Sequence, residues 1–150
     1  MLFHEANKQV IKCQVNKLVN TCKEVIPMAV ERILMFHMAV TDMAKAKEFY
    51  ADKLGFQVTR DFGQGDQHWV SLDAPGGGAS LNLTTMFENM KPGTMKLYVS
   101  TPDIEAAYQE LKARGVKVNE VMDDLYGPGS GVKWFGVSDP DGNKWLIVQS

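Results

Sequence analysis

The stretch TDMAKAKEFYADKLGF (residues 41–56) recurs in altered form as TPDIEAAYQELKARGV (residues 101–116). Three positions agree at an offset of 61 residues, and they pair Asp42 with Asp103, Ala46 with Ala107 and Tyr50 with Leu111. Such an internal repeat is evidence about the whole architecture, because each copy predicts one supersecondary unit. The chain is therefore expected to contain the same unit twice.

Both segments carry the start and stop signals of a helix. Thr41 or Asp42 is expected to cap the first helix, and Thr101 the second, with Pro102 at its first helical position. A glycine ends each helix, at Gly55 and Gly115. Apolar residues recur at spacings of three and four, which predicts one face packed on a sheet. These stripes are Met43, Ala46, Tyr50 and Leu54, and Ile104, Ala107, Tyr108 and Leu111.

Each helix is preceded by one predicted strand and followed by three. The first set reads ILMFHMAV (33–40), QVTRDF (57–62), HWVSLDA (68–74) and ASLNLTT (79–85), and the second MKLYVS (95–100), KVNEVMD (117–123), VKWFGVSD (132–139) and KWLIVQS (144–150). The fold class is thus α+β, with two tandem βαβββ modules at 33–86 and 95–150 inside a domain spanning 28–150. The Pro-Gly segment FENMKPGT (87–94) is the linker between them.

Residues 1–27 have a different pattern and predict one amphipathic helix as an N-terminal extension. Its apolar stripe needs cover from the domain or from a second subunit. Pro27 and Met28 mark the expected boundary, and Met28 is also an alternative start.

Composition narrows the partners and the compartment. A net charge of -2 over 150 residues gives no electrostatic reason to expect nucleic acid or an anionic membrane as a partner. The two cysteines, Cys13 and Cys22, are expected on opposite faces of a helix and so not in a disulfide, which fits a reducing cytosol. No apolar stretch approaches the ~20 residues of a membrane span. We therefore expect a cytoplasmic protein.

Two motifs in this tandem arrangement carry a family resemblance. D-x-x-x-A-x-x-F-Y-x-x-x-L-G-F at 42–56 and D-P-D-G-N-x-W at 139–145 resemble the vicinal oxygen chelate superfamily, that of glyoxalase I, bleomycin-resistance proteins, fosfomycin-resistance enzymes and extradiol dioxygenases. The resemblance covers about four fifths of the chain. It implies that each sheet curls into a half-barrel and that two half-barrels, within one chain or across a homodimer, enclose a cleft.

The resemblance also implies where a metal would bind. Metal enzymes of this superfamily place one His, Gln or Glu on each of four strands. The matching positions here hold Met35, Asn82, Lys96 and Leu146. None is a usual ligand of a divalent transition metal, and a lysine ammonium repels a cation. We therefore expect no metal cofactor, although a register slip of two residues would replace Met35 by His37 and leave a divalent metal open.

Seven side chains are expected to bind a ligand in the cleft: Met35, His37, Asn82, Lys96, Tyr98, Trp134 and Leu146. His37 is either a cleft residue or a histidine hydrogen-bonded within the sheet. The rows around Asn82 and Lys96 would suit carboxylate, phosphate or carbonyl oxygens if they face the cleft, and would mean little if they face solvent. Trp134 is either core packing or an aromatic wall for a planar ligand. His68 is expected in a turn.

Three hypotheses for the function of the protein remain. No Cys or Ser stands in a nucleophilic constellation, so no catalytic residue is assigned. The preferred hypothesis is a metal-independent small-molecule-binding protein of the glyoxalase and bleomycin-resistance type, acting as a homodimer. The alternative is a metal-dependent lyase, isomerase or dioxygenase with relocated ligands. A third is an assembly module organised by residues 1–27.

Overall fold

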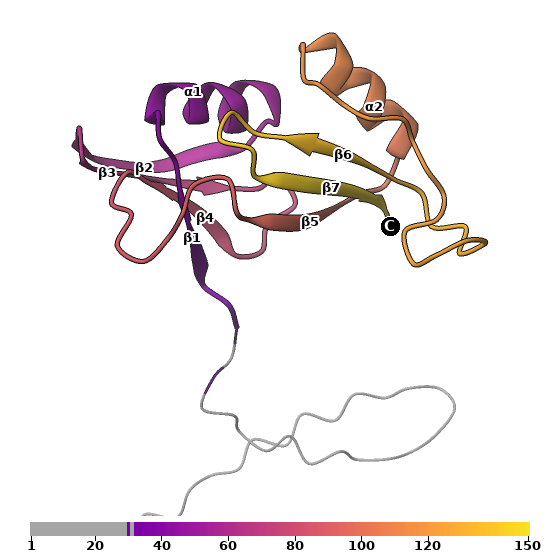
Figure 1. The fold of residues 1–150 in the computed structure, drawn as a ribbon, viewed down its shortest axis with the longest axis horizontal. Helices are drawn as coiled ribbons and strands as arrows, with labels where there is room; N and C mark the ends of the chain where they lie inside the picture. Colours follow the sequence, from indigo (N-terminus) through magenta and orange to yellow (C-terminus); the bar gives the residue numbers. More distant parts are fainter. Residues whose placement is uncertain (1–29, 31) are drawn as a thin grey trace, which may run out of the picture. The chain divides into compact units, whose positions relative to one another are not determined.

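Two modules follow one another in the computed structural model, which describes residue 30 and residues 32–150 (Figure 1). Module one contains β1 (Met35–Ala39), α1 (Met43–Lys47) continued by the π-helix η1 (Glu48–Lys53), β2 (Gln57–Gln64), β3 (Gln67–Asp73) and β4 (Ser80–Thr84). Module two contains β5 (Lys96–Thr101), α2 (Ile104–Ala113), β6 (Trp134–Ser138) and β7 (Lys144–Gln149). The α+β class is confirmed. The predicted helix at 1–27, with Cys13 and Cys22, lies outside the described residues.

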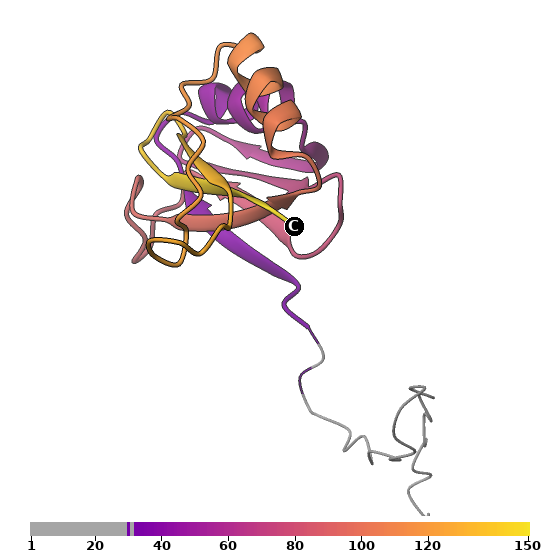
Figure 2. The same ribbon diagram turned by 90° about the vertical axis from the view of Figure 1, so that its right-hand side faces the viewer.

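Each module forms its own sheet. The strand order is β1-β4-β3-β2 in the first sheet and β5-β7-β6 in the second. In both sheets the first strand of the module pairs in parallel with the last, and the remaining pairs are antiparallel. The two helices lie on the same side of the strands (Figures 1 and 2). We call this the helix side and the opposite surface of each sheet its open face.

One of the four strands predicted for module two, the strand at 117–123, does not form. Only isolated bridges remain there, from Val118 to Val137 and from Met122 to Trp134. The cause lies in Asn119, whose side-chain carbonyl accepts the hydrogen bond of the Gly136 N–H. Because a side chain takes a place that a backbone carbonyl would hold in a ladder, pairing is interrupted and the second sheet has three strands.

Both helices begin at an aspartate. The Asp42 carboxylate accepts from the Lys45 N–H at 3.1 Å, and that of Asp103 accepts from the Ala106 N–H at 3.0 Å. The expected cap at Thr101 is therefore wrong, because the carboxylate at Asp103 reaches the free N–H groups and the helix starts only at Ile104. The predicted stops at Gly55 and Gly115 are present, with φ of 79° and 74°.

The core lies on the helix side of the sheets. Met38, Leu83, Phe135 and Trp145 from the strands meet the predicted stripes of the helices there, with Met43, Ala46, Tyr50, Ile104 and Leu111 buried and Leu54, Ala107 and Tyr108 partly buried. In η1 the Leu54 N–H bonds to the carbonyl of Phe49, five residues earlier. The wide π turn accommodates two consecutive buried rings, Phe49 and Tyr50, whose centroids are 5.2 Å apart.

A buried polar cluster joins the two modules. The Tyr50 hydroxyl in module one donates to the Asp139 carboxylate in module two at 2.6 Å, and the Trp145 indole N–H donates to the same hydroxyl at 3.2 Å. Asn143 also donates to Asp139, through its backbone and its side-chain amide. Burial, and then the neighbouring carboxylate, raise the pKa of Tyr50. We call this cluster the Tyr50–Asp139 junction, and it shows that the D-P-D-G-N motif holds module one.

Candidate functional site

The open face of the second sheet consists of three cross-strand rows. Alternation of side chains puts Phe135 and Trp145 into the core, where α2 contacts Phe135 through Tyr108, and so turns their neighbours outward. The rows follow from the register: Trp134, Val148 and Ser100; then Gly136, Leu146 and Tyr98; then Ser138, Lys144 and Lys96. All four predicted site residues of module two therefore share one face.

A cavity of about 570 Å³ lies over this face. Its lining includes Lys96, Lys117, Asn119, Trp134, Gly136, Lys144 and Leu146, and we call it the lysine pocket. The predicted Lys96, Trp134 and Leu146 are thus brought together, whereas Tyr98, in the same row as Leu146, lines a second and larger cavity. Volumes of this order are typical of small-molecule sites.

Trp134 and Gly136 shape one end of the pocket. The Trp134 indole N–H donates to the Asp124 carboxylate at 3.1 Å, which fixes the orientation of the ring. A Cβ at Gly136 would lie 2.8 Å from the Asn119 Oδ1 and 3.9 Å from the Trp134 ring. A larger residue would therefore fill the space beside the indole, so glycine keeps this space open.

The other end of the pocket is positive. Lys96 and Lys144 are direct partners across the β5–β7 pair, and Lys117 lines the same cavity. Within the part of the chain that the structure describes, none of the three forms an ion pair. The Lys96 ammonium lies 5.3 Å from the centroid of the Tyr98 ring, a cation–π distance. No Asp or Glu lines the pocket.

The predicted residues of module one lie on the open face of the first sheet, outside the lysine pocket. His37 and Asn82 are direct partners across β1 and β4. Asn82 is buried and engaged, since its Oδ1 accepts from the Ser71 hydroxyl at 2.5 Å and its Nδ2 lies 3.0 Å from the Met35 sulfur. The His37 ring is exposed and makes no hydrogen bond to the described residues, so the alternative of a histidine hydrogen-bonded within the sheet does not hold there.

The four metal positions of the superfamily do not fit a divalent cation in this chain. They supply a thioether at Met35, an amide at Asn82 that neighbours already engage, an ammonium at Lys96 and an alkyl group at Leu146. Hard and borderline metals need converging nitrogen and oxygen donors. Over residues 32–150 no three His, Cys, Asp or Glu side chains gather as a metal-binding group.

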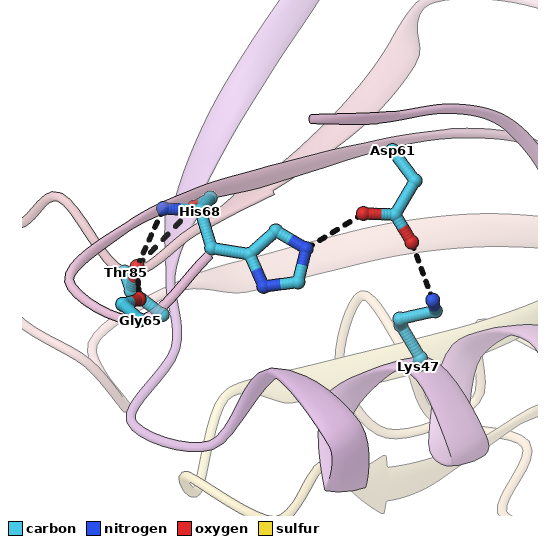
Figure 3. Close-up of polar contacts among 5 residues, drawn as sticks. All are labelled: Lys47, Asp61, Gly65, His68 and Thr85. Atoms are coloured by element: carbon cyan, nitrogen blue, oxygen red, sulfur yellow. Dashed lines mark hydrogen bonds and ion pairs between the residues drawn. The ribbon is translucent and has the colours of Figure 1, made fainter. Parts of the chain in front are cut away.

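His68 belongs to a separate polar group on the helix side of the first sheet (Figure 3). It lies in β3 rather than in the expected turn, and its Nε2 is 2.6 Å from the Asp61 Oδ1. The Lys47 ammonium of α1 lies 2.5 Å from the other oxygen of Asp61. Lys47 first, and then His68, lower the pKa of Asp61. The group ties α1 to the sheet.

A larger cavity, of about 700 Å³, lies between η1, the β3–β4 turn and α2. The guanidinium of Arg114, which lines this cavity, already has partners: it donates to the carbonyls of Asp52 and Lys53 and pairs with Glu110. Unlike the lysine pocket, this cavity offers a ligand little unpaired charge. It is better explained as a junction between modules.

Comparison with known proteins identifies the family. Residues 32–147 match the family model described as Glyoxalase/Bleomycin resistance protein/Dioxygenase superfamily. The chain belongs to this superfamily. The predicted resemblance is thereby confirmed for most of the chain.

Solved structures of other proteins share the fold. TnmS3, an antibiotic binding protein from Streptomyces sp. CB03234, is 31% identical with a TM-score of 0.70, over 82% of this chain and 98% of that one. A superfamily member from Sphaerobacter thermophilus is 25% identical with a TM-score of 0.69, over 82% and 100%. Among curated proteins, the uncharacterized YetH of Bacillus subtilis strain 168 is 28% identical, over 73% of this chain and 91% of its own.

The pocket residues that were not predicted from the sequence include Lys117, Asn119, Gly136 and Lys144. Lys144 was detectable in principle, because it opens a predicted strand directly after the D-P-D-G-N turn. Its significance depends on the parallel pairing of β5 with β7, which puts it beside Lys96. That pairing is a tertiary feature that strand patterns alone do not specify.

Proposed function

We propose that this chain is a small-molecule-binding protein that holds a flat, aromatic ligand in the lysine pocket without a divalent metal. The observation that carries the proposal is the fixed Trp134 ring, which Asp124 orients beside the space kept open by Gly136. Leu146 supplies an apolar floor in the next row of the sheet. Aromatic side chains with a fixed ring plane favour planar ligands by offset stacking.

The similarity to an antibiotic binding protein supports the same class of function. TnmS3 is similar over most of both chains, and the match concerns the modules that form the pocket here. The pocket is an open groove whose volume is also in the range of small-molecule sites.

Fluorescence titration with N-phenylnaphthylamine, an uncharged aromatic probe that brightens in apolar surroundings, tests the ring site. We expect saturable binding that Trp134→Leu weakens by about tenfold, because stacking and buried ring area are lost. The control is Tyr126→Leu, since Tyr126 is exposed and does not line the pocket. Equal binding by both variants, with melting temperatures showing that both are folded, would remove the basis of the proposal.

Metal independence is a separate part of the proposal. Elemental analysis of protein purified without chelators is expected to find no stoichiometric divalent ion, because the four positions supply an unsuitable donor set. A stoichiometric ion that is lost in His37→Ala would favour the competing metal-dependent lyase, isomerase or dioxygenase. If His37→Ala changes neither the metal content nor any measured turnover, this alternative loses His37, the residue on which it depends.

We also propose a cytoplasmic homodimer. No helix among the described residues is long and apolar enough to cross a membrane. Light scattering on the full chain and on a chain lacking residues 1–27 measures the oligomeric state. If both chains form dimers, the interface lies in the modules. If only the full chain forms a dimer, the result supports the assembly role of the N-terminal segment.

A further inference from the structure

We propose that the lysine pocket selects an anionic ligand, a flat ring that carries a carboxylate or a phosphate group. The inference rests on the proposed function and adds the chemical class of the ligand. Three features of the pocket support it: an uncompensated pair of like charges, the lack of counter-charges around them, and the distance between the charged and aromatic ends.

The first feature is the register of Lys96 and Lys144. The two residues are direct partners in the β5–β7 ladder and stand on the same open face. Like charges directly opposite each other destabilise a sheet, and Lys117 adds a third positive charge to the same cavity. An anion bound between these ammonium groups would remove the repulsion and gain charge-assisted hydrogen bonds.

The second feature is the lack of counter-charges at the pocket lysines, in contrast to several, though not all, of the other basic residues described. Lys47, Lys53 and Lys133 each form an ion pair with a nearby carboxylate. The three pocket lysines form none, and the pocket lining contains no acidic side chain. The Asp124 carboxylate, which lies beside Trp134, accepts the hydrogen bond of the indole N–H. The pocket therefore presents positive charge to whatever enters it.

The third feature is the spacing of the rows. Trp134 stands in one outer row and Lys96 with Lys144 in the other, with the row of Gly136, Leu146 and Tyr98 between them. The two outer rows are four residues apart along a strand, which is ~13 Å. Lysine side chains are long, and the Lys96 ammonium lies over the Tyr98 ring of the central row, which shortens the gap to Trp134. A flat ligand that lies across the central row can thus contact Trp134 while its acid reaches a lysine.

Isothermal titration calorimetry with a matched series tests this specificity. The probes are naphthoate, naphthyl phosphate and uncharged naphthamide, which share the ring and differ in charge. We expect the tighter of the two anions to bind at least about tenfold more tightly than the amide in dilute buffer, and salt to reduce that preference. The order of the two anions then distinguishes a carboxylate from a phosphate ligand.

Single substitutions locate the effect. Lys96→Gln and Lys144→Gln are each expected to weaken anion binding several-fold, to leave naphthamide within about a factor of two, and to raise the melting temperature of the free protein. The matched control is Lys133→Gln. Lys133 adjoins Trp134 in sequence, but its ammonium pairs with Glu105 of α2 on the helix side. Anion affinity is expected to be unchanged in this control.

The outcomes separate this proposal from the proposed function. If naphthamide binds as tightly as both anions and Trp134→Leu weakens all three probes, the ring site stands and the anionic class is wrong. If the anions bind in preference but Lys133→Gln weakens them as much as Lys96→Gln does, the preference reflects general charge and the site assignment is wrong. If none of the three probes and no N-phenylnaphthylamine binds, the proposed function fails together with this inference.

Discussion

The Tyr50–Asp139 junction should dominate the stability of the two-module unit. Replacing Tyr50 by Phe keeps the buried ring but removes the hydroxyl that donates to Asp139 at 2.6 Å and accepts from the Trp145 N–H at 3.2 Å. A hydrogen bond to a charged group contributes about 1.5–3 kcal/mol, and leaving a buried donor such as the indole N–H unpaired costs about 1–3 kcal/mol. Asp139 keeps its bonds from Asn143, so the carboxylate is not left unpaired.

We therefore expect Tyr50→Phe to lower the free energy of unfolding by about 3 kcal/mol, or the melting temperature by ~12 °C for a unit of this size. Urea unfolding and calorimetry measure both quantities. The matched control is Tyr108→Phe in α2. The Tyr108 ring packs against Phe135 at 5.5 Å, but its hydroxyl bonds to no described residue. This control should cost less than about 0.5 kcal/mol. Equal effects of the two substitutions would refute the junction as a source of stability.

Three further predictions concern single positions. The pKa of Asp61 is lowered from its ordinary value of 3.8. The stability that its carboxylate contributes is therefore present above pH 3.8 and is lost as the pH falls through the pKa of the folded state. The difference in melting temperature between wild type and Asp61→Asn should accordingly close in acid. Gly93→Ala should destabilise the chain by more than about 2 kcal/mol in urea unfolding, because φ is +77° and the new Cβ would meet the Asp141 carbonyl. Gly136→Ala should weaken N-phenylnaphthylamine binding in fluorescence titration, since its Cβ would crowd Asn119 and the space beside the indole; unchanged binding would contradict the shape assigned to the pocket.

Local signals predicted most of the fold because most of it depends on local chemistry. The stop signals at Gly55 and Gly115 act through left-handed backbone, which glycine adopts without strain. The start of α2 was placed wrongly at Thr101, since either Thr101 or Asp103 has a side chain that suits a cap and only the final backbone decides which reaches the free N–H groups. The prediction of a strand at 117–123 was wrong for a similar reason. The side chain of Asn119 accepts a hydrogen bond that a backbone carbonyl would accept in a sheet, and the alternation of residues in a sequence does not reveal this.

The candidate site was predicted only in part. Period-two alternation predicted a shared face for Lys96 and Tyr98, because adjacent residues of a strand point to opposite sides. Leu146 was predicted from the superfamily resemblance and Trp134 from its aromatic ring, and the register puts all four on one face. Alternation within a strand says nothing about which strand is its neighbour. The charge of the pocket comes from Lys144 and Lys117, which meet Lys96 only through the parallel β5–β7 pair and the loop after α2. Pocket chemistry therefore required the structure, although each lysine was visible in the sequence.

The motifs that identify the superfamily serve a structural purpose in this chain, and this explains why they say little about its ligand. Tyr50 from the helix motif and Asp139 with Asn143 from the D-P-D-G-N motif meet in the interior, where they join the modules. None of these three lines the lysine pocket, although Lys144 and Trp145, at the end of the second motif, do. Stability at the junction and ligand choice thus depend mostly on different side chains. Substitutions at the junction should change unfolding without changing the preference for anions, and substitutions at Lys96 or Lys144 should do the reverse, except for the gain in stability that relief of their repulsion brings.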